Sequence, residues 1–485
     1  MSKASLHERL NAVFANRNGR FLFSAETGKW MTYGEFEESA LRIAETLRRL
    51  SPLAGGPRIA VLCDNSAEVL AVYWAALLLG GEIVPVDVMK GREEISRLVR
   101  EAGADVVVSD RDGVDVAAAK QLGLGELLVE SRRARPMRFN GYSSVDFDGD
   151  FLTVFTSGST GTPKGIVHSF GALCLSAIAF ASRFGFSRKN TFFHNFPMSY
   201  MAGVLNTFVM PLLCGSRIVV GARQSVAAAF RFWPQVAAGE ADTFWFNPTF
   251  CNMLLQLDRG AEGVEYCGRH AITACIGTAP LDNRTRTAFE GRYGVKLHES
   301  FGLSETLFLS TNSPFDPEVP GSVGRLLDGV DATISEDGEL LVDAPWLLKG
   351  YARSEEAVAR PFRTGDLGHV DGGGRLFITG RRKDLIIKGG INVSPGKIEA
   401  FLAGNFPGLG DVSVVGHPDP VMGERTVCFF TGEALSREQE KSVDSALRRE
   451  LGRDYAVDAF FRIDRLPLTS NGKVDKPALR KWRAG

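Results

Sequence analysis

Short apolar runs alternate with helical patterns along the first third of the chain. Residues 58–63 and 82–86 are apolar runs of strand length, and the segment 67–79 between them has the composition of a buried helix. A helix over 93–101 and a strand over 104–109 repeat the unit. Strands that are apolar throughout and separated by helices are typical of a parallel sheet covered on both faces. The pattern therefore predicts an α/β fold built from βαβ units.

Two helices in this part of the chain begin with capping signals. Thr32 is followed three residues later by Glu35, which is the pattern of a capping box for a helix that runs to about Arg49. Asp64, Asn65 and Ser66 supply N-cap side chains for the helix over 67–79. Both helix starts can therefore be predicted from local sequence.

The pattern changes near residue 331. Short strands separated by Asp-Gly and Gly-Gly-Gly turns indicate a small antiparallel, barrel-like region, which ends in the charged segment 380–384. The last hundred or so residues have their own helices and strands, as expected for a separate α+β domain. We therefore predict a large domain over 1–382 and a small, mobile domain over 383–485.

Charge and hydropathy exclude several classes of protein. The chain has 56 Lys and Arg against 57 Asp and Glu, a formal net charge of -1, so no nucleic-acid partner is predicted. The longest apolar stretches, 69–79 and 170–182, are shorter than the ~18 residues that a membrane span requires, so no span is predicted.

Cysteine usage and the first residues indicate a cytoplasmic protein. The seven cysteines are scattered and none has CxxC spacing, which is typical of reduced core residues. Charged residues occupy the first positions, where a signal peptide would need an apolar run. Because cysteines and histidines do not cluster, any metal is expected on oxygen ligands.

A loop rich in glycine and hydroxyl residues, TSGSTGTPKG at 156–165, directly follows the apolar strand 151–155. Inward-turned N–H groups, hydroxyl donors and the cation of Lys164 suit a polyphosphate, although a loop of this composition can equally exist without a ligand. Gly165 stands where a Walker A loop needs Ser or Thr, and the loop does not fit GxGxxG. Ordinary P-loop NTPases and Rossmann dehydrogenases are therefore disfavoured.

Three further segments are ambiguous when each is taken alone. Glu305 could bind Mg²⁺ beside a phosphate loop or simply face solvent. Asp366 could accept hydrogen bonds from a ribose diol or close a turn. Asn471-Gly472-Lys473 alone is best interpreted as a solvated turn. Their combination decides the interpretation.

Together and in this order, the motifs resemble the adenylate-forming superfamily of acyl-CoA synthetases, peptide-synthetase adenylation domains and beetle luciferases. The matching motifs are the loop at 156–165, Glu305, Asp366, Gly380-Arg381, Gly389-Gly390 and Asn471-Gly472-Lys473. Stretches at 197–203, 277–281, 320–324, 338–340 with 349–351, and 391–395 also look like that family. The resemblance covers essentially the whole chain.

The resemblance implies an ATP-dependent acid–thiol ligase. In such enzymes a carboxylic acid attacks the α-phosphate of ATP, pyrophosphate leaves, and a thiol then takes the acyl group from acyl-AMP. Negative charge on the phosphorus is stabilised by fixed cations and N–H donors. By similarity, the catalytic residues would be Lys473, Thr160, Glu305 and Arg381, with Glu305 as the Mg²⁺ ligand.

The resemblance also implies a set of nucleotide contacts. These are Thr156, Ser157, Gly158, Ser159, Thr160, Gly161, Lys164, Gly277, Thr278, Ala279, Phe301, Gly302, Ser304, Asp366 and Arg381. Asp366 would bind the ribose hydroxyls, helped by Arg381, and Phe301 stands where an aromatic residue, usually Tyr, stacks on adenine. Ser304 replaces the threonine that usually contacts the α-phosphate. Lys383 matches the family's hinge, about which Lys473 would leave and Gly389-Gly390 would line a tunnel for the thiol.

The acid pocket is predicted by the same resemblance. Its residues would be Tyr200, Met201, Trp245, Phe246, Asn247, Gly277, Thr278, Gly302 and Leu303. Tyr200 stands where many acyl-CoA synthetases have histidine, and the aspartate that pairs with an α-amino group is absent. An apolar or aromatic acid is therefore favoured over an α-amino acid, with Asn247 as a polar contact.

CoA is the expected acceptor, with ATP and Mg²⁺ as cofactors. A freestanding enzyme that loads the acid onto a carrier-protein phosphopantetheine is an alternative that the sequence does not separate from the first. A non-catalytic protein that binds nucleotide or acid is disfavoured by the intact Glu305, Asp366, Arg381 and Lys473. A luciferase-like oxygenase shares the adenylation residues, but no residue favours it.

Overall fold

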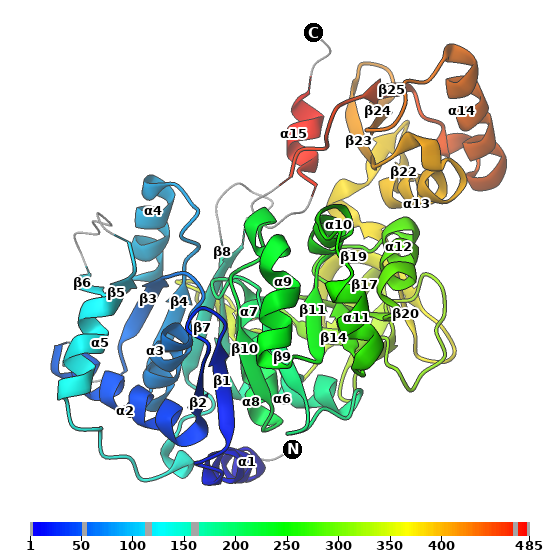
Figure 1. Cartoon of the computed structure of the whole chain (residues 1–485). Coiled ribbons are helices and arrows are strands. Elements are labelled where there is room, and N and C mark those ends of the chain that lie inside the picture. Colours follow the sequence, from blue (N-terminus) through cyan, green and yellow to red (C-terminus); the bar gives the residue numbers. More distant parts are fainter. Residues whose placement is uncertain (1–2, 51–55, 112–118, 157–163, 469–473, 483–485) are drawn as a thin grey trace.

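Two large β-sheets and the helices around them form most of this computed structural model (Figure 1). The structure describes residues 3–50, 56–111, 119–156, 164–468 and 474–482. A small C-terminal domain lies at one end of the large domain, on the side of helices α10 (Pro248–Leu257) and α12 (Asn283–Tyr293). The predicted α/β architecture with a smaller C-terminal domain is confirmed.

The first sheet has seven strands in the order β18-β8-β7-β4-β3-β5-β6. Strands β7, β4, β3, β5 and β6 are parallel, whereas β8 is antiparallel to β7 and β18 antiparallel to β8. The bounds are β3 (Arg58–Leu62), β4 (Glu82–Pro85), β5 (Val106–Ser109), β6 (Lys120–Gly123), β7 (Asp150–Thr156), β8 (Lys164–Ser169) and β18 (Gly350–Tyr351). The chain thus leaves this sheet at Thr156 and returns at Lys164, at the carboxyl edge of its parallel strands.

The second sheet has nine strands in the order β15-β14-β13-β12-β11-β9-β10-β1-β2. The central strands from β13 to β1 are parallel, and β14 and β2 are antiparallel to their neighbours. The bounds are β1 (Arg20–Ser24), β2 (Lys29–Thr32), β9 (Thr191–His194), β10 (Arg217–Val220), β11 (Thr243–Phe246), β12 (Thr273–Ile276), β13 (Leu297–Leu303), β14 (Leu307–Thr311) and β15 (Arg325–Leu326).

A continuous apolar core joins the two sheets, and helices fill it. The indole of Trp74 on α3 (Ala67–Leu78) shows the packing: its ring centroid lies 6.2 Å from that of Phe36 on α2 (Tyr33–Leu50) and 5.6 Å from that of Phe170 on α6 (Phe170–Ser182). The other helices near this core are α1 (Lys3–Ala15), α5 (Leu124–Arg133), α7 (Met201–Val204), the π-helix η2 (Leu205–Val209) and α8 (Met210–Leu213).

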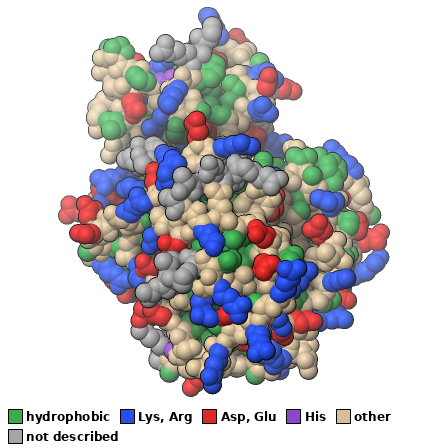
Figure 2. Space-filling model, turned by 90° about the vertical axis from the view of Figure 1, so that its left-hand side faces the viewer, with side chains coloured by type: hydrophobic (Ala, Val, Ile, Leu, Met, Phe, Trp, Pro, Cys, Tyr) green, Lys and Arg blue, Asp and Glu red, His purple; other side chains and the backbone are tan. Residues whose placement is uncertain are grey.

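Separate apolar clusters cover the outer faces of the sheets. Helices α9 (Val226–Gly239), α10, α11 (Glu262–Arg269) and α12 cover the nine-stranded sheet, and α4 (Arg92–Ala102) covers the seven-stranded one. On the face shown in Figure 2, basic and acidic side chains are interspersed, in line with the formal net charge of -1. No helix among the described residues combines the length and hydropathy needed to cross a membrane.

The C-terminal third contains two smaller sheets. The predicted antiparallel region is a four-stranded sheet of β16 (Asp331–Ile334), β17 (Glu339–Asp343), β19 (Phe362–Val370) and β20 (Leu376–Arg381). The small domain has its own sheet and apolar core, formed with β21 (Ile386–Lys388), β22 (Ile391–Val393), α13 (Pro395–Asn405), β23 (Val412–Asp419), β24 (Gly423–Phe430), α14 (Arg437–Leu451), β25 (Ala459–Arg462) and α15 (Lys476–Lys481). Ser394 Oγ donates to Thr379 O at 2.9 Å, which ties this domain to the end of β20.

Candidate active site

The two described ends of the predicted phosphate loop lie directly opposite each other. Thr156 at the end of β7 pairs with Lys164 at the start of β8. Thr156 is half-buried, whereas Lys164 is exposed. Ser157, Gly158, Ser159, Thr160 and Gly161 lie outside the described residues. The structure therefore positions the loop's cation, Lys164, at the carboxyl edge of the seven-stranded sheet.

Strand β18 brings Glu305 to the same place. It pairs with β8, and the N–H of Leu348, two positions before the strand, donates to Glu305 O at 2.8 Å. Lys164 Nζ lies 5.3 Å from the ring centroid of Tyr351. Burial, and secondarily the charge of Glu305, raises the pKa of that tyrosine. Lys164 and Glu305, which are 141 positions apart, are thus both neighbours of Tyr351.

Glu305 lies in a tight turn between β13 and β14. The N–H of Leu303 donates to Thr306 Oγ1 at 3.1 Å, which closes the turn. Gly302 is required there, because a Cβ atom at that position would lie 2.0 Å from Leu307 O. The turn carries Ser304 and Glu305, both half-buried.

His168 supports this turn and was not predicted from the sequence. Its Nε2 lies 2.6 Å from Ser304 O, and the side chain is fully buried in β8. Burial lowers the pKa of His168 to about 4, so the ring is neutral at neutral pH. The sequence carries no motif for this contact, because it depends on how the two sheets are packed.

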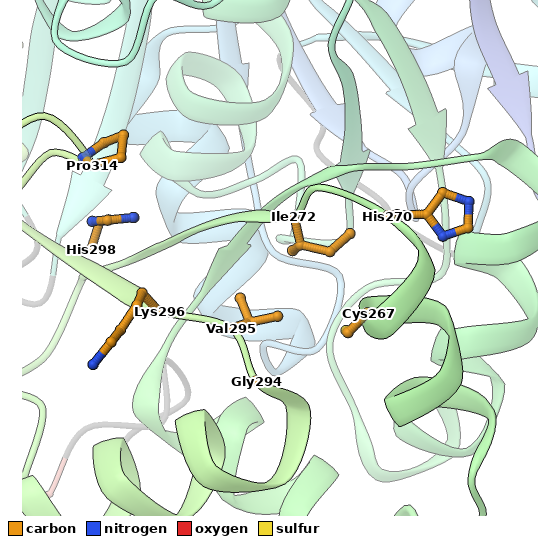
Figure 3. Close-up of a pocket in the computed structure, with 8 residues that line it drawn as sticks. All are labelled: Cys267, His270, Ile272, Gly294, Val295, Lys296, His298 and Pro314. Carbon is orange, nitrogen blue, oxygen red and sulfur yellow. The ribbon is translucent and has the colours of Figure 1, made fainter.

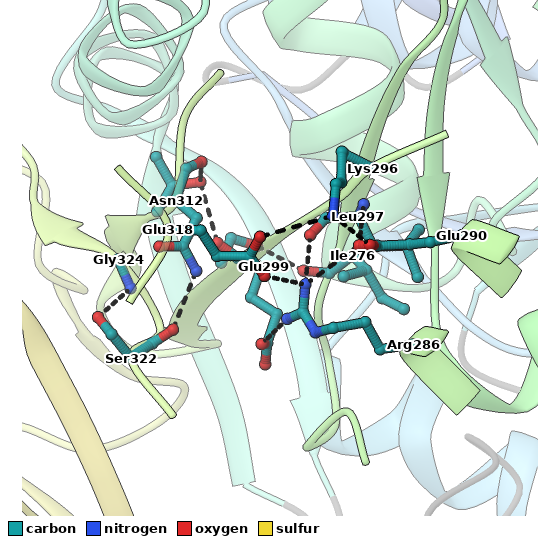
Figure 4. Close-up of polar contacts among 12 residues, drawn as sticks. Ile276, Arg286, Glu290, Lys296, Leu297, Glu299, Asn312, Glu318, Ser322 and Gly324 are labelled. Atoms are coloured by element: carbon teal, nitrogen blue, oxygen red, sulfur yellow. Dashed lines mark hydrogen bonds and ion pairs between the residues drawn. The ribbon is translucent and has the colours of Figure 1, made fainter. Parts of the chain in front are cut away.

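A polar network holds the strand that leads into the turn (Figure 4). Arg286 on α12 forms an ion pair with Glu299 of β13 and donates to Leu297 O at 2.9 Å. The same guanidinium lies 3.4 Å from Glu290 and 3.3 Å from Glu318. This cluster anchors β13 upstream of the predicted nucleotide residues.

Asp366 and Arg381 form the predicted pair on neighbouring strands. They are in register on β19 and β20, and Arg381 Nε lies 2.9 Å from Asp366 Oδ1. Asp366 also has its main-chain N–H bonded to Thr364 Oγ1 at 3.1 Å. A buried carboxylate held in this way is suited to accept hydrogen bonds from a diol.

The remaining predicted nucleotide residues lie at the carboxyl ends of β12 and β13. Gly277 follows β12, where a Cβ atom would lie 2.8 Å from Ser300 Oγ, and Thr278 has a φ of +69°. Ala279 and Phe301 are half-buried. The adjacent parallel strands therefore bring 277–279 and 301–305 to one edge, as open α/β sheets do at ligand sites.

Tyr200 and Trp245 lie on the side of the core shared by the two sheets. Burial raises the pKa of Tyr200 to about 12, against the opposing effect of the Arg381 charge, so the phenol is neutral. Trp245 is buried between Phe180 and Phe308, whose ring centroids lie 5.1 and 5.4 Å from its own. Met201 is also buried, and Leu303 is half-buried.

Phe246 and Asn247 are placed differently from Trp245. Phe246 points to the opposite face of β11 and packs with Phe250 and Phe289 in the outer core. Asn247 is the N-cap of α10, where its side chain accepts from the N–H of Phe250 at 2.7 Å. The structure therefore separates the side chain of Phe246 from that of Trp245, and Asn247 has a structural partner in α10.

The predicted thiol-tunnel and hinge residues lie on the small domain and its connection. Gly389 and Gly390 form the turn between β21 and β22 with φ of 59° and 83°, and both are exposed. Lys383 is exposed in the 3₁₀ helix η3 (Arg382–Asp384), directly after β20. Lys473 lies outside the described residues.

A cavity of about 340 Å³ lies elsewhere, at the opposite end of β12 and β13 (Figure 3). It is lined by Cys267, His270, Ile272, Gly294, Val295, Lys296, His298 and Pro314. Burial raises the pKa of the Cys267 thiol to about 12, so it is not a nucleophile at neutral pH. This cavity contains none of the predicted nucleotide, metal or acid residues.

Comparison with known proteins identifies two family models in the chain. Residues 11–352 match the model described as AMP-binding enzyme, and residues 397–473 match the model described as AMP-binding enzyme C-terminal domain. Sulfoacetate–CoA ligase of Cupriavidus necator is 28% identical over 94% of this chain and 93% of its own. 2-Succinylbenzoate–CoA ligase of Bacillus velezensis is 27% identical over 99% and 96%. The crystal structure of ATP-bound MatB from Rhodopseudomonas palustris has 25% identity, a TM-score of 0.86 and 98% coverage of both chains.

Proposed function

The chain belongs to the AMP-binding enzyme family, and from this premise we propose that it is an ATP-dependent acid–CoA ligase that forms an acyl-AMP intermediate. Relatives that align over nearly their full length are CoA ligases by name. The observation that carries the proposal is the placement of Lys164 and Glu305 around Tyr351, where the chain leaves and re-enters the seven-stranded sheet. A cation at this edge suits the phosphates of a nucleotide, and a carboxylate suits the Mg²⁺ that accompanies them.

In the first half-reaction, a carboxylate oxygen of the acid forms a bond to the α-phosphorus of ATP, and the bond from that phosphorus to the bridging oxygen breaks. Pyrophosphate leaves and acyl-AMP remains. We assign Lys164 to the phosphates, Asp366 with Arg381 to the ribose, and Phe301 to the adenine. Lys473 would bridge the attacking carboxylate and the nucleotide. The chain's contribution is orientation and charge stabilisation, because the reaction needs no general base.

Glu305 is the residue we assign to Mg²⁺. In proteins Mg²⁺ usually takes one or two carboxylates together with phosphate oxygens and water. A single carboxylate near Lys164, where the chain returns to the seven-stranded sheet, fits an ion that takes its other ligands from phosphate and water. When bound, Mg²⁺ neutralises phosphate charge. His168 at Ser304 O and the N–H of Leu348 at Glu305 O hold Glu305 in place.

In the second half-reaction, the sulfur of the acceptor thiol forms a bond to the acyl carbon, and the carbon–oxygen bond to AMP breaks. The thiol proton goes to solvent. We propose that the small domain, 383–485, turns about Lys383 between the two steps, so that Lys473 leaves and Gly389-Gly390 approach the acyl group. The exposed glycine turn and the short connection after β20 support this assignment.

We propose an uncharged apolar or aromatic tail for the acid. Trp245, Phe180 and Phe308 form an aromatic wall, and the phenol of Tyr200 is neutral. The nearby cation of Arg381 is paired with Asp366. A second anionic group on the acid would therefore be costly to bury at this wall.

CoA is the proposed acceptor and the cytoplasm the proposed location. The alternative acceptor is the phosphopantetheine of a carrier protein, which offers the same thiol at the end of the same arm. The rate of thioester formation can be compared between free CoA and a purified carrier protein, with one preparation of enzyme and acid.

ATP–pyrophosphate exchange tests the proposal before any thiol is added. A panel of aryl, short-chain, long-chain and amino acids is expected to give exchange with at least one apolar or aromatic acid. Adding CoA should then yield the thioester and AMP. Measurable ATP binding without exchange for any acid would favour the non-catalytic alternative.

A further inference from the structure

His168 connects the two sheets at the active site. It lies in β8 of the seven-stranded sheet, in the strand that begins at Lys164. Its Nε2 is 2.6 Å from the main-chain oxygen of Ser304, in the turn between β13 and β14 of the nine-stranded sheet. The side chain thus reaches from the strand of the predicted phosphate loop to the residue before Glu305.

A second hydrogen bond holds the other side of Glu305. The N–H of Leu348 donates to Glu305 O at 2.8 Å, and the N–H of Lys349 donates to Val167 O in β8, also at 2.8 Å. Ser304 O belongs to the peptide before Glu305, and Glu305 O belongs to the peptide after it. Both peptide planes are therefore held from the β8 side, which restricts the direction of the Glu305 side chain.

The chemistry of the contact requires a donor at residue 168. A carbonyl oxygen only accepts, so His168 Nε2 must carry the proton. The Nδ1 atom has no hydrogen-bond partner among the described residues, and the whole side chain is buried. An apolar residue would fill the space but leave the Ser304 carbonyl without this donor.

We propose that His168 is a positioning residue for Mg²⁺·ATP: it holds the Ser304–Glu305 peptide so that the Glu305 carboxylate faces the edge of the seven-stranded sheet at Lys164 and Tyr351. This inference rests on the proposed function, because it requires Glu305 to act on the metal-bound nucleotide. A histidine that only filled space in β8 would not affect the Mg²⁺-dependent affinity for ATP. Supporting residues around a metal ligand typically contribute about 10–100-fold to metal affinity or activity.

Three variants separate positioning from stability. His168→Leu removes the donor, whereas His168→Gln places an amide N–H close to where Nε2 lies. Ser176→Ala is the matched control: Ser176 is fully buried on α6, and its Oγ accepts from the N–H of Phe308 at 3.2 Å, in the same β13–β14 hairpin but beyond the turn. If His168→Leu does not fold, His168→Asn replaces it, because its shorter amide reaches only the Nδ1 position.

Calorimetric titration with ATP, in Mg²⁺ and again in EDTA, provides the main readout. His168→Leu is expected to lose roughly 10-fold in ATP affinity in Mg²⁺ and to keep the wild-type affinity in EDTA. His168→Gln should keep most of the Mg²⁺-dependent affinity. Hydrogen exchange of the amides at 303–306 should accelerate in His168→Leu and not in His168→Gln.

The outcomes distinguish this inference from the proposed function. Wild-type protein that binds ATP equally in Mg²⁺ and EDTA would contradict the metal site itself. Wild-type protein with a clear Mg²⁺ effect, together with a His168→Leu variant that retains it, would overturn only the role of His168. An equal loss in EDTA, or the same Mg²⁺-specific loss in Ser176→Ala, would also overturn it.

Discussion

Arg381 reaches the carboxylate of Asp366 from the adjacent strand, with Nε 2.9 Å from Oδ1. The two side chains differ in burial: that of Asp366 is 2% exposed, and that of Arg381 is 42% exposed. The carboxylate is almost fully desolvated, whereas the guanidinium remains partly hydrated. Removing one partner is therefore expected to have a different effect from removing the other.

Arg381→Ala should destabilise the protein more than Asp366→Asn. The first variant removes a charged hydrogen bond from a buried carboxylate, which should lower the free energy of unfolding by about 2 kcal/mol. The second keeps the shape of the side chain and leaves a cation that water can solvate. Urea denaturation of both variants measures the difference. Both should also raise the KM for ATP, and equal stability losses would contradict the asymmetry.

Lys473→Ala should block acyl-AMP formation but spare thiol transfer from preformed acyl-AMP, because each half-reaction is proposed to use its own arrangement of the small domain. Pyrophosphate exchange measures the first step, and thioester formation from synthetic acyl-AMP measures the second. Lys476→Ala is the control, since Lys476 Nζ is bound to Glu399 Oε1 at 2.8 Å within the small domain. Equal damage to both steps in Lys473→Ala would argue against domain rotation.

Trp245→Ala should extend the range of acids toward bulkier ones, because it removes an aromatic side chain from the wall of the proposed acid pocket. The rate of exchange with a bulky acid is expected to rise at least roughly 10-fold relative to that with the native acid. Phe244 is equally buried in β11 but belongs to the outer core. Phe244→Ala should cost a similar ~3–5 kcal/mol of stability without changing the acid profile.

His194 should make the protein less stable in mild acid. Burial lowers the pKa of this histidine to about 3, whereas in the unfolded chain it is about 6.5. Between these values the unfolded chain takes up a proton that the folded chain does not, so stability falls as the pH decreases from 6.5. The loss should approach about 1.4 kcal/mol per pH unit.

His194→Asn tests that pH dependence. Its amide can keep the hydrogen bond that His194 Nδ1 makes to Thr207 Oγ1, but it does not titrate. Urea denaturation between pH 5 and 7.5 should give a shallower curve for the variant than for the wild type. Parallel curves would show that His194 does not titrate in the unfolded chain as expected.

Much of the fold could be predicted because local sequence determines it. The Thr32–Glu35 capping box is present, with Glu35 Oε2 accepting from the N–H of Thr32 at 2.7 Å. Ser66 Oγ accepts from the N–H of Val69 at 3.2 Å, as its N-cap position predicts. All seven cysteines are free thiols, and all but Cys214 are buried. Caps, apolar runs and burial are properties of short segments.

The parts of the site that sequence did not reveal depend on contacts between distant segments. The bond from His168 to Ser304 joins two sheets, and neither residue carries a signal of the other. The opposite directions of Trp245 and Phe246 follow from strand alternation, once β11 is known to end at Phe246. The helix cap formed by Asn247 also had a local signal, because Pro248 and Thr249 follow it at the start of a helix.

The pairing of β1 with β10 has a consequence during synthesis of the protein. Leu22 is paired with Ile218, so about 200 further residues must be synthesised before the parallel neighbour of this first strand leaves the ribosome. At ~5–20 residues per second this interval is about 10–40 s. Until then the apolar strand Arg20–Ser24 has only β2 beside it, and its other edge is open to pairing with foreign chains. Nascent chains halted before residue 217 should therefore be the ones that depend most on chaperones.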